Sequence, residues 1–348
     1  MVGIDVGSSS VKAALLAKSG SGYKLKSLAL ADVRRPEFYP EEDAQNALEA
    51  PRRAIERVLK DRALARKMCS CGAAGPRVAA RLFRFPKLDG KEVASAVRFE
   101  AEQVIPFDLA EAALDYVLFD DVMEDGALKT EGLVVATHRD EVDKLFNLLK
   151  STGLDPVVFD IDTLALANCY LQTHDVNKRQ VTAILNIGAR FSNLAILHGE
   201  NRVFVRDIAS GGDMVSRSIS EMYGLDLPSA ERRKRELVYQ GLESGSTSPG
   251  GASAGGGEKK STDTGRFSTN ADYDLVNQDE DMILMDDDAD QTATDLPVGG
   301  SAPKSPNRQL LQEALSELVH EVEDTFKYYM NKRIVPKVDQ LLLTGGSS

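Results

Sequence analysis

Residues 4–16 read IDVGSSSVKAALL, a run of glycine and serine between two short apolar segments. Glycine-rich phosphate loops usually lead from a strand into a helix. This stretch has neither GxGxxG nor GxxxxGKS/T spacing, and SGSG follows VKAALLA too soon for a helix. The pattern therefore predicts strand, tight turn, strand, which fits both an ordinary β-hairpin and a phosphate-binding turn.

A second stretch, LNIGARFSNLAIL at residues 185–197, repeats this pattern. Asp5 and Asn186 stand at equivalent positions, an acid and an amide two residues before a glycine. A short variable turn and an apolar strand follow Gly7 and Gly188 alike. Because each copy opens a half of the chain that continues into β and then helical patterns, we infer an internal duplication.

Two related hairpins with tight glycine turns suggest a clamp for a phosphate chain. Glycine lets the backbone approach an anion closely, and successive N–H groups in such turns form an anion-binding nest. Ser8, Ser9 and Ser10 add hydroxyl donors to the first turn. Asp5 could position Mg²⁺ through water, because Mg²⁺ keeps several of its waters and binds few carboxylates directly.

Composition bounds the class of protein. The 348 residues predict two domains or one large one, and 42% hydrophobic content is enough for a core. Thirteen acids and four bases fall within 240–305, so this segment carries −9 of the total charge of −12. Neither this segment nor the rest of the chain has the excess of basic residues that nucleic-acid binding needs, so we expect no nucleic-acid partner.

Cysteine, histidine and hydropathy patterns exclude further classes. Cys69, Cys71 and Cys169 form no disulfide framework or zinc signature, and reduced cytosolic thiols are expected. The four histidines are scattered, which argues against a metal site or a Ser/His triad. The sequence contains no signal peptide and no apolar run of 18 residues, so we expect a chain that does not enter a membrane.

Periodicity predicts an alternation of strands and helices, the mark of an α/β layer. The segment 242–306 is Gly/Ser/Thr-rich and then acidic, and we expect it to be disordered. The C-terminal VDQLLLTGGSS predicts a buried strand that runs into a Gly-Gly turn. Strands are expected within 2–30 and 181–208 and at 77–85, 114–122, 132–138 and 156–161; helices are expected from Pro51 and at 91–104, 140–153 (closed by Gly153), 162–171, 228–241 and 307–333.

Several segments carry a family resemblance. GIDVGSSSVKAALL, the second hairpin and LLLTGGSS look like the two phosphate motifs and the adenosine motif of the actin-like ATPase superfamily. Further stretches resemble the PilM family of type IV pilus assembly proteins, and the cell-division protein FtsA is similar in fold. These stretches are RFEAEQVIPFD (98–108), FDIDTLALANCYL (159–171), VRDIASGGDMVSRSI (205–219), SAERRKREL (229–237) and EVEDTFKYYM (321–330).

The resemblance implies an α/β fold of the actin-like, ribonuclease H-like duplicated kind, with two lobes and an inserted α+β subdomain. It covers nearly everything except 242–306. The implied division is a first-lobe core (1A) at 1–25 and 131–178, an inserted subdomain (1C) at 26–130, a second-lobe core (2A) at 179–208 and 336–348, and a second-lobe subdomain (2B) at 209–335 that contains the acidic insert 242–306.

The resemblance also implies roles for residues of the first lobe. Asp5 would face the Mg²⁺ shell, and Gly7, Ser8, Ser9 and Ser10 would wrap the β- and γ-phosphates of ATP. Lys12 would contact a phosphate; the alternative is an exposed strand lysine. Asp160 would position the attacking water, with Asp162 as the nearby competitor, and a helix N-cap is the alternative for either.

In the second lobe, the resemblance assigns the remaining nucleotide contacts. Glu231 and Lys234 would contact ribose or adenine, and the alternative is a solvated i,i+3 pair. The second phosphate turn would be Gly188, Ala189 and Arg190, the nucleotide-proximal turn Gly211 and Gly212, and the adenosine loop Gly345, Gly346 and Ser347.

The sequence departs from the family pattern in three places. Asn186 stands where many relatives have Asp, so we expect ATP binding but leave ATP hydrolysis open, as weak or absent. The long acidic insert at 242–306 is not typical of the family. The family continues beyond the position of Ser348 into a further helix and strand, so we expect either a shortened sequence or a second lobe that is incomplete.

The resemblance implies a cytoplasmic ATP-binding scaffold that is peripheral at the inner membrane through its partners. It would dock the cytoplasmic N-terminal tail of a bitopic, PilN-type inner-membrane protein, beside other proteins of the pilus inner-membrane subcomplex. The expected groove lies between the first core and the inserted subdomain, and AEQVIPFD would either line it or pack in a core. The rival functions are a type II secretion platform subunit, an FtsA-like cell-division protein and a small-molecule kinase of the same superfamily.

Overall fold

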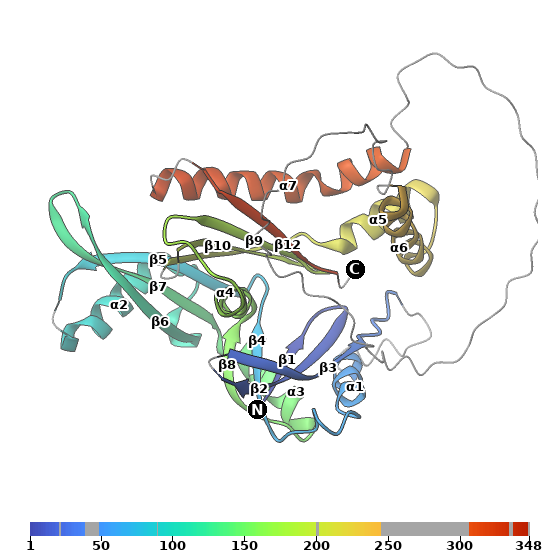
Figure 1. Cartoon of the computed structure of the whole chain (residues 1–348), viewed down its shortest axis with the longest axis horizontal. Helices are drawn as coiled ribbons and strands as arrows, with labels where there is room; N and C mark the ends of the chain where they lie inside the picture. Colours follow the sequence, from blue (N-terminus) through green and yellow to red (C-terminus); the bar gives the residue numbers. More distant parts are fainter. Residues whose placement is uncertain are drawn as a thin grey trace, which may run out of the picture.

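The structure is a computed structural model that describes residues 1–20, 22–38, 49–88, 90–199, 202–244, 306–333 and 337–346. These residues form three sheets (Figure 1), with strand orders β3-β2-β1-β4-β8, β11-β10-β9-β12 and β5-β7-β6. Of the predicted disordered insert, 245–305 lie outside the described residues. Its two ends do not fit the prediction, since residues 242–244 end one helix and Pro306 begins another.

The first sheet carries the first hairpin. β1 (Val2–Val6), β2 (Ser10–Ser19) and β3 (Gly22–Asp32) are antiparallel neighbours, while β4 (Met68–Ala73) and β8 (Asp155–Ile161) extend the sheet in parallel. Apolar side chains of α1 (Glu49–Val58) and α3 (Arg139–Ser151) pack in the core on one face of it. The predicted hairpin and both helices are confirmed; α1 begins two residues before Pro51, and Gly153 follows α3 with φ +84°.

The second sheet repeats the first. β9 (Val181–Ile187), β10 (Ser192–His198) and β11 (Arg202–Ile208) are antiparallel, and β12 (Gln340–Gly345) lies parallel to β9. One face packs against α7 (Pro306–Arg333) through Leu318, Val322 and Tyr329. The other packs against α4 (Asp162–Thr173), which follows β8 of the first sheet. The chain thus passes from the first sheet directly into α4, the helix that packs on the second sheet.

The hairpins of the two sheets match residue by residue. Asp5 pairs with Lys12 across β1 and β2, and Asn186 pairs with Asn193 across β9 and β10. Each of these residues lies 181 positions from its equivalent. The equal register confirms the internal duplication.

β12 corrects one prediction. The run LLL predicted a buried strand, yet Leu341 is 45% exposed and Leu343 67% exposed. β12 lies at the edge of its sheet, with β9 as its neighbour among the described strands. An apolar run predicts a strand but cannot distinguish a central strand from an edge strand.

The third sheet forms the inserted part of the first half of the chain. It comprises β5 (Val78–Pro86), β6 (Ala112–Glu124) and β7 (Ala127–His138), with α2 (Gly90–Val104) and the short 3₁₀-helix η2 (Leu109–Glu111) beside it. β3, α1 and β4 belong to the first sheet and its core, which contradicts an insert that begins at residue 26. We therefore propose an inserted subdomain of about 75–138.

The inserted subdomain also contacts the second lobe. Val78 and Ala80 of β5 pack in one cluster with Val203 and Val205 of β11. Buried Glu131 of β7 accepts a hydrogen bond from Arg84 at 2.8 Å and lies 3.7 Å from Arg202 of β11. The subdomain therefore bridges the two halves of the chain.

Two helices complete the second lobe beside α7. α5 (Gly212–Tyr223) and α6 (Leu227–Ser244) pack together through Val215, Ile219 and Ala230. The sequence predicted the end of α6 at Gly241, but the helix continues to Ser244.

Candidate functional site

The first glycine turn joins β1 to β2. The Gly7 N–H donates to the Ser10 carbonyl at 3.0 Å, and a Cβ on Gly7 would lie 2.9 Å from that oxygen. Only glycine fits this close approach. Ser10 is 3% exposed, and its Oγ has no hydrogen-bond partner among the described residues. A buried hydroxyl without a partner is costly, and a ligand oxygen at this turn would satisfy it.

The second turn has the same geometry. The Gly188 N–H donates to the Phe191 carbonyl at 3.0 Å, and Phe191 is the equivalent of Ser10. The two predicted phosphate turns are therefore built alike. Phenylalanine at this position leaves the second turn without the hydroxyl that Ser10 provides in the first.

Asp5 and Lys12 form an ion pair next to the first turn. The Lys12 Nζ lies 2.9 Å from the Asp5 Oδ2, and both side chains are about 40% exposed. Lys12 is thus a partly exposed lysine on β2 that has a carboxylate partner. The pair places an ammonium group beside a carboxylate. The ammonium can bind a phosphate, and the carboxylate can bind a hydrated cation.

Asp162, rather than Asp160, experiences the charge of Asp5. A Cβ on Gly72 would fall 1.9 Å from the Asp162 Oδ1, so the carboxyl group sits over the bare backbone of β4. Burial, and then repulsion from Asp5 and Asp207, raises the pKa of Asp162 to about 7. The Asp160 carboxylate accepts from the Ile161 N–H at 2.8 Å, and burial raises its pKa.

Neither acid is the N-cap of α4, because Ile161 occupies that position. The helix-cap alternative for these two residues is therefore wrong. The signal that could have favoured Asp162 is Gly72, a glycine inside a strand, which often marks a close approach by another group.

Asp207 connects the halves and was missed at the sequence level. It accepts hydrogen bonds from the Asn193 Nδ2 at 2.7 Å and, across the lobes, from the Thr163 hydroxyl and the Gly75 N–H, each at 3.0 Å. Asn186 donates to the Asn193 Oδ1 at 3.1 Å. The second hairpin therefore carries an amide pair where the first carries an ion pair.

The glycines of the second lobe converge on its glycine turn at Gly188. The Gly212 and Asp213 N–H groups donate to the carbonyls of Gly188 and Ala189 at 2.9 and 2.8 Å. A Cβ on Gly211 would lie 2.6 Å from both carbonyl oxygens. The adenosine-loop residue Gly345 pairs with Ile187 at the start of the same turn, and Gly346 follows it. Ser347 lies outside the described residues.

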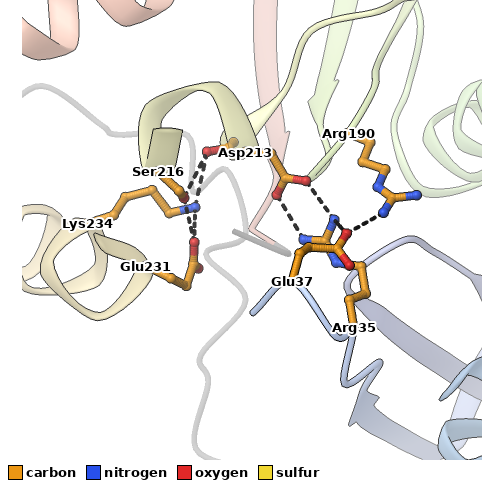
Figure 2. Close-up of polar contacts among 8 residues, drawn as sticks. Arg35, Glu37, Arg190, Asp213, Ser216, Glu231 and Lys234 are labelled. Atoms are coloured by element: carbon orange, nitrogen blue, oxygen red, sulfur yellow. Dashed lines mark hydrogen bonds and ion pairs between the residues drawn. The ribbon is translucent and has the colours of Figure 1, made fainter. Parts of the chain in front are cut away.

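Lys234 and Glu231 meet beside Gly212 (Figure 2). The Lys234 Nζ donates to the Gly212 carbonyl at 3.2 Å and lies 2.8 Å from Glu231, which accepts from the Ser216 hydroxyl at 2.6 Å. Lys234 is 5% exposed, and burial lowers its pKa. The solvated-pair alternative is therefore wrong. Lys234, held by Glu231, therefore fixes the backbone of the glycine turn at Gly212.

Arg190 and Asp213 lie at the boundary with the first lobe (Figure 2). The Arg190 Nη2 lies 2.5 Å from Glu37, and Asp213 receives two hydrogen bonds from Arg35. Arg35, Glu37 and Asp213 had not been predicted as site residues. Their partners are far away in the sequence, so no local pattern marks them.

Two chemical features are absent from the described part of the chain. It holds no group of three or more His, Cys, Asp or Glu side chains placed to bind a metal. None of its helices combines the length and the apolarity needed to cross a bilayer.

A family model described as "Type IV pilus assembly protein PilM" matches residues 3–241. The solved "PilM-PilN type IV pilus biogenesis complex" is similar at a TM-score of 0.66 and 21% identity, over 100% of this chain and 81% of that chain.

Two further solved structures match more weakly. MreB5 of Spiroplasma citri bound to ADP matches at a TM-score of 0.42 and 14% identity, over 99% of this chain and 84% of its own. The cytoplasmic domain of EpsL, from the type II secretion system of Vibrio cholerae, matches at 0.38 and 12%, over 65% and 75%.

The fold predicted from the sequence, an actin-like ATPase fold of α/β class with duplicated lobes, is confirmed by the structural match and by the repeated sheets. The family match covers more than half of the chain. The chain therefore belongs to the PilM family of type IV pilus assembly proteins.

Proposed function

We propose that this protein binds ATP between its two glycine turns and acts in pilus assembly as a nucleotide-responsive scaffold. The observation that carries the nucleotide part is the buried Ser10 hydroxyl, which has no partner among the described residues and lies in one of two matched turns. Gly7 and Gly188 let both turns close tightly, because a Cβ at either position would meet a carbonyl oxygen of its own turn. Successive N–H groups in such turns can form an anion-binding nest.

Charged groups beside the turns fit a phosphate chain with its cation. Lys12 would contact a phosphate, and Asp5 would hold a water of Mg²⁺ rather than the ion itself. Mg²⁺ would neutralise phosphate charge there. The nucleoside would lie beside Gly211, Gly212, Gly345 and Gly346. Gly211 and Gly345 pack against backbone carbonyls of the second turn, whereas nothing lies within 4 Å of the Cβ position of Gly346. Lys234 and Glu231 keep the glycine turn in place.

The same groups support slow hydrolysis or none. Asp162 is the better candidate for orienting a water, because its carboxyl group sits over the bare backbone of Gly72 in β4, the strand that pairs with β1. With a pKa of about 7 it is only partly ionised at neutral pH, and Asn186 contributes no charge. We therefore propose that nucleotide acts mainly as a conformational ligand.

The partner we propose is the cytoplasmic N-terminal tail of a PilN-type bitopic inner-membrane protein. Support comes from family membership and from the similar solved complex of PilM with PilN. In AEQVIPFD, Ala101 and Ile105 pack in the core of the inserted subdomain, whereas nearby Phe99 is 61% exposed. We propose that exposed side chains of this subdomain, Phe99 among them, meet the tail, and that this contact holds the protein at the inner face of the membrane.

The nucleotide assignment is tested by binding of a fluorescent ATP analogue. We expect Lys12→Ala and Gly7→Asp to abolish binding while the circular dichroism spectrum stays unchanged. Lys18→Ala is the matched control, because Lys18 is an exposed lysine on the same strand. Unchanged affinity in both site variants would remove the assignment.

The scaffold assignment is tested by a pull-down with the synthetic N-terminal tail of the PilN-type protein, with and without ATP. Binding that changes with ATP supports the proposal, and no binding in either state contradicts it. A phosphotransfer screen addresses the kinase alternative, since fast ATP consumption that depends on a small acceptor would replace the scaffold role.

A further inference from the structure

The segment 33–38 runs from the first glycine turn toward the second lobe. The Val33 N–H donates to the Ser9 carbonyl at 2.8 Å, so the segment is anchored on the turn itself. The Phe38 N–H donates to the Arg35 carbonyl at 2.9 Å, and the Arg35 guanidinium lies 4.4 Å from the Phe38 ring centre. Arg35 is therefore held in place before it meets the other lobe.

Arg35 forms a two-pronged ion pair with Asp213 of α5 (Figure 2). The Arg35 Nη1 lies 2.6 Å from the Asp213 Oδ2, and the Nη2 lies 2.9 Å from the Oδ1. Both side chains are only about 10% exposed. Because the Asp213 N–H is bonded to the Ala189 carbonyl, this single pair ties the first glycine turn to the second.

A second pair lies beside the first and is more accessible. Glu37 lies 2.5 Å from Arg190 and 3.6 Å from Arg35. The charges alternate in the order Arg190, Glu37, Arg35, Asp213. Arg190 is 49% exposed at its side chain, so the chain of charges runs from an accessible arginine in the second turn to a buried aspartate.

We propose that the Arg35–Asp213 pair is an interlobe latch that holds the two lobes together without nucleotide. The pair joins the two lobes by direct contact between side chains, and a bound nucleotide would add a second connection between them. Removing Asp213 leaves Arg35 with only the longer contact to Glu37, and removing Arg35 leaves the Asp213 carboxylate without its two-pronged partner; either change favours separation of the lobes. That ATP closes an unlatched protein rests on the proposed function; that the latch closes the nucleotide-free protein does not.

The latch can be tested by double electron–electron resonance between spin labels at Lys60→Cys and Met222→Cys. Both positions are exposed, one after α1 in the first lobe and one on α5 in the second. Cys169→Ser removes the exposed native thiol, while Cys69 and Cys71 are buried. We expect the wild-type background to give one predominant short distance without nucleotide.

Asp213→Asn and Arg35→Ala are the latch variants. Without nucleotide we expect the fraction of longer distances to rise at least about tenfold in each, and Mg²⁺ with ATP to return it to the wild-type value. Arg77→Ala is the matched control, because Arg77 forms a similar two-pronged pair with Asp140, exposed and without second-lobe residues. This control should leave the distances unchanged.

The outcomes separate the two proposals. Wild-type distances in both nucleotide-free latch variants would overturn the latch, whatever ATP does. Opened variants that ATP fails to close would support the latch and contradict nucleotide bridging. If one of the two variants does not fold, the other decides: a folded variant with the wild-type distance overturns the latch, and a raised fraction of long distances supports it.

Discussion

Asn193 occupies in the second hairpin the position that Lys12 occupies in the first. Lys12 faces Asp5 as an ion pair at 2.9 Å, and Asn193 accepts a hydrogen bond from Asn186 at 3.1 Å. Duplication has preserved the backbone geometry of the two hairpins while their charges have diverged. The first turn can balance the charges of an anion and a cation, and the second offers neutral dipoles.

The first prediction concerns this loss of charge. Asn186→Asp places a second carboxylate near the proposed position of Mg²⁺, and we expect ATP turnover to rise on the order of tenfold. Phosphate release measures the effect, with Asn186→Ser as the uncharged control. Equal turnover in all three proteins would show that this position does not limit hydrolysis.

The packing of Gly211 predicts a loss of stability. A Cβ here would lie 2.6 Å from two carbonyl oxygens of the second turn, so Gly211→Ala should lower the free energy of unfolding by about 1–3 kcal/mol. Urea denaturation followed by circular dichroism measures it. Gly22→Ala is the control, since nothing lies within 4 Å of its Cβ position, and an equal loss in both variants would contradict the packing argument.

Asp162 predicts a dependence of stability on pH. Its folded-state pKa, about 7, is raised above the ordinary 3.8, so the folded state binds a proton that the unfolded state has released between these values. This group's contribution to stability is therefore largest below about pH 4, falls as the pH rises toward 7, and is lost above it.

Asp162→Asn removes this penalty. We expect the variant to be about 2–4 kcal/mol more stable than wild type at pH 8, with a much smaller difference at pH 4. Urea denaturation at the two pH values measures the change, and Asp175→Asn, at an exposed position, is the control. A difference that does not change with pH would refute the buried, partly protonated carboxyl.

Thiol accessibility gives a further prediction. Cys169 is exposed, whereas Cys69 and Cys71 are buried in the first core and burial raises the pKa of both. A chromogenic disulfide reagent should therefore titrate one thiol quickly in the native protein and three in denaturant. Cys169→Ser should abolish the fast phase; fast reaction of a second thiol would show that the first core opens.

Much of the fold could be predicted from the sequence, because the patterns that specify its hairpins and helices involve residues close together in the chain. The two hairpins, the apolar stripes of α1 and α7 and the glycine after α3 each depend on neighbouring residues. The repeat could be recognised because equal register requires equal spacing. The paired turns could likewise be predicted from the glycine that opens each of them.

Other features depend on contacts between distant residues. Arg35 and Asp213 lie 178 positions apart, and no periodicity marks either. Asp160 was assigned from the family resemblance with Asp162 as its competitor, and the approach of Asp162 to Gly72 is not visible in the sequence. The insert boundary failed for a similar reason, since membership of β4 in the first sheet depends on its pairing with β1.

The path of α4 has a consequence for how the protein can be divided. Although it follows the last strand of the first sheet, its Ala167 and Tyr170 pack with Ile184, Ala195 and Leu197 of the second sheet. The first half thus lends a helix to the second, as protomers do in a domain-swapped dimer. Expressed alone from residue 179, the second half would carry a bare apolar face, so the duplicated halves are structural repeats without being autonomous folding units.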